Sequence, residues 1–146
     1  MICSVSIFNY KRPILVLGAG VRLANAGNEA LAFAHAAGMP IAPTWAALDL
    51  VPHDDPLFIG SFGTHGTRYG NLAVQNADFI LSVGSRLDSK STGTPPSTFA
   101  PKARRIMVDI DQTEIDKFQH MGLKIEGICK DAKEFFRSFS LHSMLD

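Results

Sequence analysis

Gly18, Ala19 and Gly20 form a turn directly after the apolar run "PILVL". Glycine has no Cβ, so the backbone at such a turn can approach a phosphate or a planar ring closely. As a dinucleotide fingerprint the turn is incomplete, because the GxGxxG pattern would require glycine where Leu23 stands. The next apolar run is followed by "PT" at residues 43–44 and by no acid. The turn is therefore a candidate ligand contact. The sequence does not match a conventional NAD-linked Rossmann domain, because it lacks both the third glycine and the acid.

The stretch "GTHGTRYGN" at residues 63–71 is the second candidate. Gly63 permits positive φ and close approach, while Thr64 and His65 offer a hydroxyl and an imidazole. The alternative is a glycine-rich loop whose histidine faces solvent. The stretch taken alone favours neither interpretation.

A third turn, "GSRLD" at residues 84–88, also follows an apolar run. Gly84 gives this turn its conformational freedom. Arg86 suits a phosphate or a stacked ring, because its guanidinium is planar and permanently charged. Asp88 completes the candidate set at this turn, and a salt bridge between Arg86 and Asp88 is the structural alternative.

Two carboxylates follow a fourth apolar run. Asp109 and Asp111 alternate with Ile110, so both should face the same side of a strand end. One of them could accept a hydrogen bond from a ribose or ribityl hydroxyl. Asp111 with Glu114 three residues later also has the spacing of a capping box for the following helix. We favour the cap for Asp111, which leaves Asp109 as the better contact candidate.

Patterns that carry chemistry by themselves are missing from the sequence. It contains no GxxxxGK[ST] phosphate loop, no HExxH, no GxSxG and no cluster of cysteine with histidine. We therefore expect no catalytic residue and no metal ligand in this chain. The formal net charge is zero, from 14 basic and 14 acidic side chains. The sequence therefore lacks the excess of positive charge that is typical of nucleic-acid-binding domains.

Two further features bear on where the protein resides. No run approaches the ~20 apolar residues that cross a bilayer. The two cysteines, Cys3 and Cys129, form no disulfide framework. We expect a cytoplasmic protein without a membrane or nucleic-acid partner.

The elements that position the candidate turns alternate between strand and helix. This alternation predicts an α/β fold: a doubly wound, mostly parallel, Rossmann-like sheet with helices on both faces. We predict strands at residues 13–20, 39–45, 78–85, 104–111 and 123–128, and helices at 24–38, 69–77 and 130–139. Gly38 is the expected stop of the first helix. In such a sheet the four candidate turns all lie at the carboxyl ends of strands, where ligands bind.

The segment "DSKSTGTPPSTFAPK" at residues 88–102 separates the third and fourth predicted strands. Serine, threonine, proline and glycine dominate it, and these residues disfavour helix. We predict a long surface excursion without a helix.

Several longer stretches together resemble a known family. The similar stretches, in chain order, are "RPILVLGAG" (12–20), "PLFIGSFGTHGTRYGNLAVQNADFILSVGSRLD" (56–88), "FAPKARRIMVDIDQTEI" (99–115) and "KDAKEFF" (130–136). They resemble the central domain of thiamine-diphosphate-dependent enzymes of the acetolactate synthase type, in the large catalytic subunit. The resemblance implies a central domain at 12–140, an atypical N-terminal segment or cloning remnant at 1–11, and a C-terminal tail at 141–146.

The same resemblance implies what this chain would do. In that family two flanking domains bind thiamine diphosphate and Mg²⁺, and the enzymes are carboligases or decarboxylases that form homodimers or homotetramers. The motif GDG, which holds the metal there, does not occur in this sequence. The chain is thus expected to be a scaffold domain that is not catalytic by itself, while the parent would be a transferase or lyase.

The resemblance also implies a ligand for the central domain, which holds FAD in acetolactate synthases and ADP or nothing in other relatives. Carried over by motif, the neighbours of that ligand are Gly18, Ala19, Gly20, Gly63, Thr64, His65, Gly84, Arg86, Asp88, Asp109 and Asp111. This chain departs from the family at Thr64, where methionine is usual, and in "GSRLDSK", which loses an acid and an arginine. Two other functions stay open: a ligand-free structural or oligomerisation domain, and a free-standing NAD-binding enzyme that would depend on His65.

Overall fold

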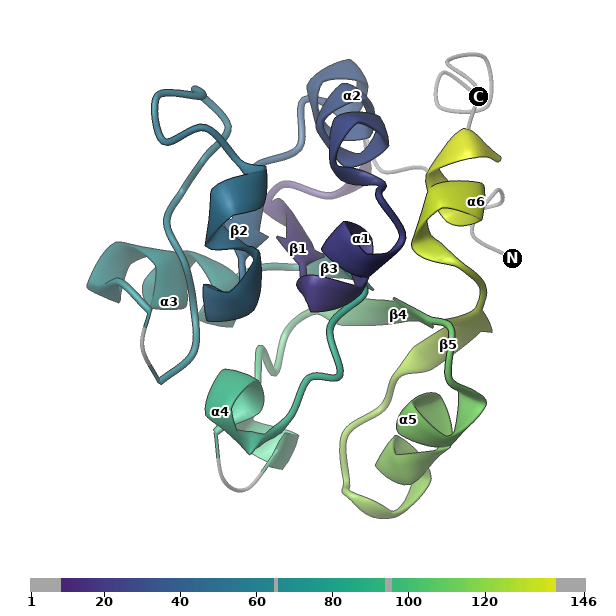
Figure 1. Cartoon of the computed structure of the whole chain (residues 1–146). Coiled ribbons are helices and arrows are strands. Elements are labelled where there is room, and N and C mark those ends of the chain that lie inside the picture. Colours follow the sequence, from purple (N-terminus) through teal and green to yellow (C-terminus); the bar gives the residue numbers. More distant parts are fainter. Residues whose placement is uncertain (1–8, 65, 94–95, 139–146) are drawn as a thin grey trace.

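The strands form one sheet in which all neighbours run parallel. The structure, a computed structural model, describes residues 9–64, 66–93 and 96–138. The strands are β1 (Pro13–Leu17), β2 (Ile41–Pro43), β3 (Phe79–Val83), β4 (Arg104–Asp109) and β5 (Glu126–Cys129). Their order across the sheet is β2-β1-β3-β4-β5, and every pair is parallel (Figure 1). The predicted doubly wound α/β fold is confirmed, with an entirely parallel sheet among the described strands.

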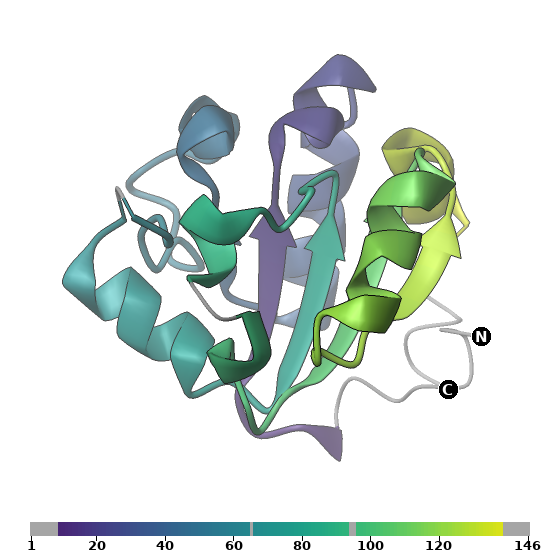
Figure 2. The same cartoon turned by 90° about the horizontal axis from the view of Figure 1, so that it is seen from below.

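Helices cover both faces of this sheet. One face carries α1 (Ala19–Leu23), α2 (Gly27–Ala37) and α6 (Ala132–Arg137), and the other carries α3 (Arg68–Gln75), α4 (Ser89–Thr92) and α5 (Gln112–Asp116) (Figures 1 and 2). Short 3₁₀ helices complete the set: η3 (Trp45–Leu50), η4 (Pro96–Thr98) and η5 (Lys117–His120). None of the helices in the described ranges is long and apolar enough to span a membrane.

The strands are apolar because both of their faces are covered. Along β1, Leu15 and Leu17 belong to the core under α2 and α6, while Ile14 and Val16 belong to the core under α3 and α5. All residues of β3 are buried. A central parallel strand therefore reads as a continuous apolar run, which is the pattern that the sequence shows.

The helical segment predicted at 24–38 is two helices. Asn25 lies between α1 and α2 with φ of 54°, a left-handed conformation that interrupts a helix. The strand predicted at 13–20 correspondingly ends at Leu17, and Ala19 already begins α1. The predicted stop is confirmed: Gly38 caps α2 in the left-handed region, with φ of 64°.

The prediction that residues 88–102 contain no helix is wrong. α4 and η4 both lie in this segment. Asp88 starts the first of them, because its backbone carbonyl accepts from Thr92 N at 3.0 Å and its carboxylate accepts from Ser91 N at 3.3 Å. An aspartate with polar residues after it can begin a helical turn even where helix propensity is low.

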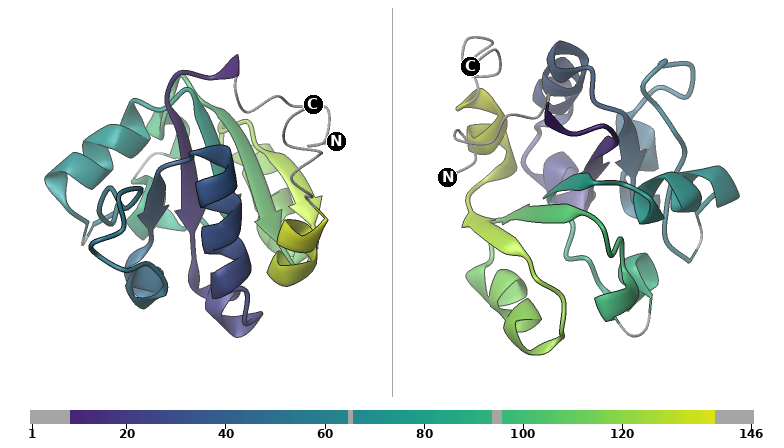
Figure 3. Two further views of the ribbon diagram at one scale, coloured as in Figure 1. Left: turned by 90° about the horizontal axis from the view of Figure 1, so that it is seen from above. Right: turned by 180° about the vertical axis from the view of Figure 1, so that it is seen from behind.

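The order of the strands reverses between β1 and β3. From β1 the chain moves outward to β2, and it then returns to place β3, β4 and β5 on the other side (Figure 3). An open parallel sheet binds ligands where its strand order reverses, beyond the carboxyl ends of the strands. The residues that follow β1 and β3 are therefore the first place to look for a site.

Two buried serines on and after β3 give a test of the packing. Ser82 Oγ is buried without a hydrogen-bond partner in the described part of the chain, whereas Ser85 Oγ accepts from Leu87 N at 3.2 Å. We expect Ser82→Ala to leave the free energy of unfolding unchanged or to raise it, and Ser85→Ala to lower it by about 1 kcal/mol. Urea unfolding measures both, and a larger loss for Ser82→Ala than for Ser85→Ala would contradict the assignment.

Candidate functional site

A hollow of about 540 Å³ opens at the carboxyl edge of the sheet. It lies at the switch point between β1 and β3 and extends to the ends of β2 and β4. Most of the predicted site residues line it: Gly18, Ala19, Gly20, Thr64, Gly84, Arg86, Asp88, Asp109 and Asp111. Four turns that are far apart in the sequence thus meet in one place.

One predicted residue, His65, lies outside the described residues. Gly63 lines a neighbouring hollow, and its backbone is held by Asn71, which accepts from Gly63 N at 2.7 Å and donates to Gly63 O at 3.0 Å. The loop that precedes α3 is therefore fixed to that helix at Gly63 by two hydrogen bonds.

The glycines of the first and third turns pack against each other. A Cβ on Gly18 would overlap the Gly84 carbonyl oxygen, and a Cβ on Gly84 would lie 2.6 Å from Val21 N. Gly18 N donates to Val83 O at 3.0 Å, and Gly20 N donates to Gly84 O at 2.9 Å. These glycines provide space for a backbone crossing, and two N–H groups of the turn are already bound within the protein.

Arg86 lies on a loop whose backbone is bound by Lys117. Lys117 Nζ donates to Arg86 O at 2.8 Å and to Glu114 Oε2 at 2.7 Å, which ties the loop to α5 and η5. Leu87 is buried and anchors the loop with φ of 49°. The Arg86 side chain stays exposed, and the salt bridge to Asp88 considered from the sequence is not formed. The guanidinium is thus available to an anionic or planar group.

Asp109 and Asp111 have different environments. Asp109 is 9% exposed, and its carboxylate accepts from Asp111 N at 2.9 Å. Burial raises the pKa of Asp109, and the hydrogen bond from Asp111 N opposes this rise. Asp111 is exposed and accepts from Thr113 Oγ1 at 2.6 Å and Thr113 N at 2.9 Å. These two bonds hold the pKa of Asp111 below its usual value.

The predicted cap at Asp111 is confirmed, because its side chain accepts from the first turn of α5. The capping box is incomplete, since the Glu114 carboxylate binds Lys117 and Asp111 N donates to Asp109. Asp109 therefore has two roles that the structure shows: it fixes the entry to α5 and it lines the hollow.

Three large apolar side chains also line the hollow, and the sequence interpretation missed them. Leu23, Trp45 and Ile110 are 86%, 68% and 73% exposed. Trp45 directly follows Thr44 at the carboxyl end of β2, so the rule applied to the other strand ends would have found it. Exposed aromatic and aliphatic groups around a polar floor can hold a planar ring.

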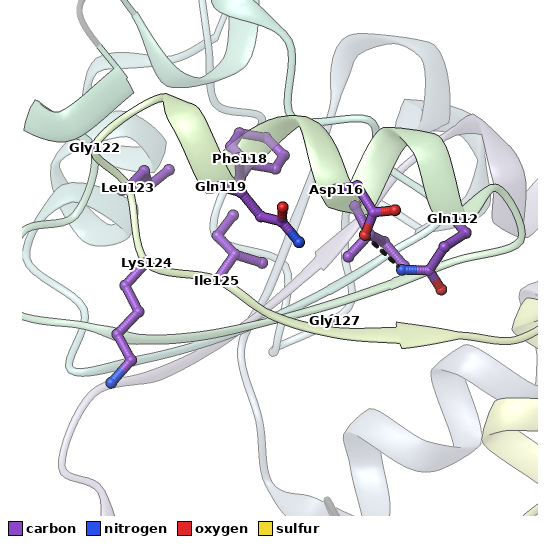
Figure 4. A pocket seen from close by; sticks show the side chains of 10 residues that line it. Gln112, Asp116, Phe118, Gln119, Gly122, Leu123, Lys124, Ile125 and Gly127 are labelled. Carbon is purple, nitrogen blue, oxygen red and sulfur yellow. Dashed lines mark hydrogen bonds between the residues drawn. The ribbon is translucent and has the colours of Figure 1, made fainter.

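A second large hollow contains none of the predicted site residues. It has a volume of about 630 Å³ and lies between α5, η5 and β5 (Figure 4). Gln112 Nε2 donates to Asp116 Oδ1 at 2.8 Å on its rim. Within the described residues, no group of three or more histidine, cysteine, aspartate or glutamate side chains could hold a metal ion.

Comparison with known proteins identifies relatives over most of the chain. The family model described as thiamine pyrophosphate enzyme, central domain, matches residues 6–138. The chain is 40% identical over 124 residues to the acetolactate synthase large subunit of Corynebacterium glutamicum, which covers 85% of this chain and 19% of that protein. It is 38% identical over 117 residues to the acetolactate synthase isozyme 2 large subunit of Escherichia coli, which covers 80% of this chain and 21% of that protein. The chain thus spans about a fifth of these relatives.

A solved structure has the same fold. The X-ray structure of a Mycobacterium smegmatis protein described as a thiamin diphosphate-dependent enzyme superposes with a TM-score of 0.70. The similarity covers 94% of this chain and 25% of that one at 21% sequence identity. At this identity the likeness concerns the fold alone.

The turns that contain Gly18 and Gly84 touch backbone to backbone, and we call this contact the glycine crossing. It predicts that one added methyl group at Gly84 lowers the free energy of unfolding strongly. Gly84 and Gly38 both have positive φ, but a Cβ on Gly38 would meet nothing within 4 Å. We expect Gly38→Ala to lower the free energy of unfolding by about 1 kcal/mol, from the backbone conformation alone. We expect Gly84→Ala to lower it by about 3 kcal/mol or more, because overlap is added. If urea unfolding gave equal losses of stability for Gly38→Ala and Gly84→Ala, the two turns would not be in close contact.

The raised pKa of Asp109 predicts a dependence of stability on pH. Asp109→Asn removes a charge that burial disfavours and keeps an oxygen that accepts from Asp111 N. Folding raises the pKa, so the wild type loses stability as pH rises from the unfolded to the folded pKa of Asp109. We expect the variant to have the higher Tm at pH 7 and the difference to close as pH falls through this range. Calorimetry at several pH values measures it, and a difference independent of pH would contradict the cause.

Proposed function

The chain belongs to the family of thiamine pyrophosphate enzyme central domains, and on this basis we propose that it is a scaffold domain whose carboxyl-edge hollow holds a nucleotide. The ligand we propose is FAD or ADP, bound by the predicted residues Gly18, Ala19, Gly20, Gly63, Thr64, His65, Gly84, Arg86, Asp88, Asp109 and Asp111. The observation that supports this most strongly is the meeting of four separate turns with Trp45 in one hollow at the switch point.

The chemistry of the lining suggests which part of the ligand each group would contact. Asp109 and Asp111 are hydrogen-bond acceptors, which suits ribose or ribityl hydroxyls. Arg86 is the cation of the lining and suits a phosphate. Trp45 is an exposed aromatic residue of the lining and suits stacking on a base or flavin. The three carboxylates near one arginine disfavour a ligand that is all phosphate.

The length of the groove favours a dinucleotide over ADP. The central hollow shares Phe62, Thr64 and Ser91 with a hollow of about 410 Å³ beside α3. On its other side it shares Gly20 and Ile110 with one of about 160 Å³ beside α6. Adjoining hollows suit an extended ligand that crosses the strand ends, as FAD would.

The wider assignment concerns the parent protein. We propose that flanking domains bind thiamine diphosphate and Mg²⁺ in a cytoplasmic homodimer or homotetramer, a transferase or lyase like acetolactate synthase. The central domain would be residues 12–140, with 1–11 as an atypical segment and 141–146 as a tail. Support comes from relatives of which the matched part of this chain makes up only about a fifth. This domain would position its neighbours and supply no reacting group.

One observation favours a ligand-free scaffold as the second candidate. The N–H groups of Gly18 and Gly20, which would otherwise point at a phosphate, are bound to Val83 and Gly84. In a domain that binds no ligand, glycines at these turns would likewise serve to bring the two backbones together. The two candidates differ in whether any nucleotide binds.

Retention of flavin tests the proposal. The protein is mixed with FAD, desalted and examined for absorbance near the flavin bands, and ADP is titrated by calorimetry. We expect FAD to be retained, and Arg86→Ala to weaken its binding by about tenfold through loss of a charge-assisted contact. Arg137→Ala, on the outer surface of α6, is the matched control and should change affinity by less than about twofold.

Each outcome decides between the candidates. Retained FAD with a loss specific to Arg86→Ala supports the nucleotide groove. Binding of ADP but not FAD corrects the ligand and keeps the groove. No binding of either overturns the nucleotide proposal and leaves the ligand-free scaffold.

A further inference from the structure

β5 is the outermost strand on its side of the sheet. No described segment pairs with its outer edge, and most of its residues are exposed. The hollow of about 630 Å³ forms a groove beside β5, between this strand and α5 with η5 (Figure 4). The edge of an unpaired strand presents N–H and C=O groups to which another strand can bind. The outer edge of β5 is therefore a candidate interface.

The backbone groups on this edge can be identified. Lys130 N donates to Asp109 O at 3.0 Å, so the backbone at this residue points toward β4. Alternate residues of a strand point their backbone groups to opposite sides. The N–H and C=O groups of Gly127 and Cys129 therefore face outward along the free edge.

The side chains next to these outward backbone groups carry opposite charges. Glu126, Ile128 and Lys130 alternate with the outward residues and share the face that carries α6, because Ile128 packs against the core under α2 and α6. Arg104 donates to both carboxylate oxygens of Glu126, each at 2.9 Å, which holds this carboxylate in one position. Lys130 forms no ion pair with another described residue. The strand thus offers a fixed anion and, four residues later, a cation that needs a counter-charge.

The same spacing selects a register for two copies of the strand. Outward residues must lie opposite outward residues, and two symmetric antiparallel registers then pair most of β5 with its counterpart. If the axis passes through Gly127, Lys124 lies opposite Lys130 of the other copy. If it passes through Ile128, Glu126 lies opposite Lys130 of the other copy, and symmetry forms this pair twice. Opposite charges stabilise a strand pair and like charges destabilise it, so the register about Ile128 is favoured.

We propose that the outer edge of β5 is an interface between two copies of this chain, which pair antiparallel about Ile128 and join two sheets into one. Gly127 of each copy exchanges two backbone hydrogen bonds with Cys129 of the other. Glu126 and Lys130 lie opposite each other in a pair whose Cα atoms are about 4.5 Å apart, the closer of the two antiparallel spacings. The carboxylate has acceptor sites left for Lys130 beside those that Arg104 uses.

The groove beside β5 accommodates the second strand on the other face of the sheet. Ile115 lies over Gly127, since a Cβ on this glycine would overlap the Ile115 side chain. In the proposed register the residue opposite Gly127 is Cys129, whose side chain is short and exposed. The second copy therefore brings only a thiol next to Ile115.

The size and place of the interface determine how it can be observed. β5 has only four residues, and small interfaces give weak, transient complexes. We therefore expect a dimer that dissociates on dilution. Residues 126–130 do not line the carboxyl-edge hollow, so dimerisation and nucleotide binding can fail separately.

Reversing the charge of Lys130 tests the register. Sedimentation velocity of the full chain at concentrations up to about 1 mM measures self-association. We expect a dimer for the wild type and, for Lys130→Glu, association that is at least about tenfold weaker, because two like pairs replace two opposite pairs. Lys124→Glu changes the net charge equally but lies outside the paired residues, so it should change association by less than about twofold. In the register about Gly127, both variants would associate more strongly than the wild type.

Mixing two variants gives a stricter test. Lys130→Glu and Glu126→Lys each place like charges opposite each other in a homodimer, whereas their heterodimer restores both opposite pairs. We expect neither variant alone to dimerise and an equal mixture to regain the association of the wild type. The control mixture of Lys124→Glu with Glu126→Lys has the same net charges but restores only one pair, so it should not regain it. Circular dichroism verifies that each variant is folded.

Hydrogen exchange locates the interface. The amides of Gly127 and Cys129 should gain protection as the wild type is concentrated, while the amide of Lys130, which bonds Asp109, stays protected at every concentration. A wild type that is monomeric up to about 1 mM would overturn the proposal. So would a dimer that Lys130→Glu does not weaken, a variant mixture without restored association, or protection of Gly127 and Cys129 that does not depend on concentration.

Discussion

The close crossing of Gly18, Gly20 and Gly84 is the constraint on which the carboxyl edge depends. The turn after β1 and the turn after β3 touch backbone to backbone, with Gly18 N bound to Val83 O and Gly20 N bound to Gly84 O. No residue with a Cβ fits at these contacts without a shift. Because β1 and β3 flank the switch point, this contact sets how close the two turns on either side of it lie.

The crossing also determines what the site can do. Its N–H groups are used within the protein, so the groups of the hollow that could contact a ligand are side chains such as Arg86, Asp109 and the exposed Trp45. None of them forms a reactive set with another, and no metal-binding cluster exists in the described ranges. Such a site can hold and orient a ligand. The matched part of this chain makes up about a fifth of the acetolactate synthase large subunits to which it is similar.

The sequence predicted what depends on local pattern. Continuous apolar runs located the strands, Gly38 marked the end of α2, and Asp111 capped α5. The meeting of the four turns followed from parallel topology alone. The break at Asn25 and the helix begun by Asp88 were missed, because weak helix propensity did not reveal the hydrogen bonds that decide them. Lys117 was missed for another reason: its bond to Arg86 joins residues 31 positions apart, which no local pattern encodes.

The central claim is that the turns joined by the glycine crossing form a single binding groove. Titrating isotope-labelled protein with FAD and with ADP, and following each backbone amide by two-dimensional NMR, tests it most directly. The account predicts that amides of residues 18–20, 84–88 and 109–111 shift together with one common affinity. Unshifted turns, or shifts confined to the groove beside β5, would contradict it.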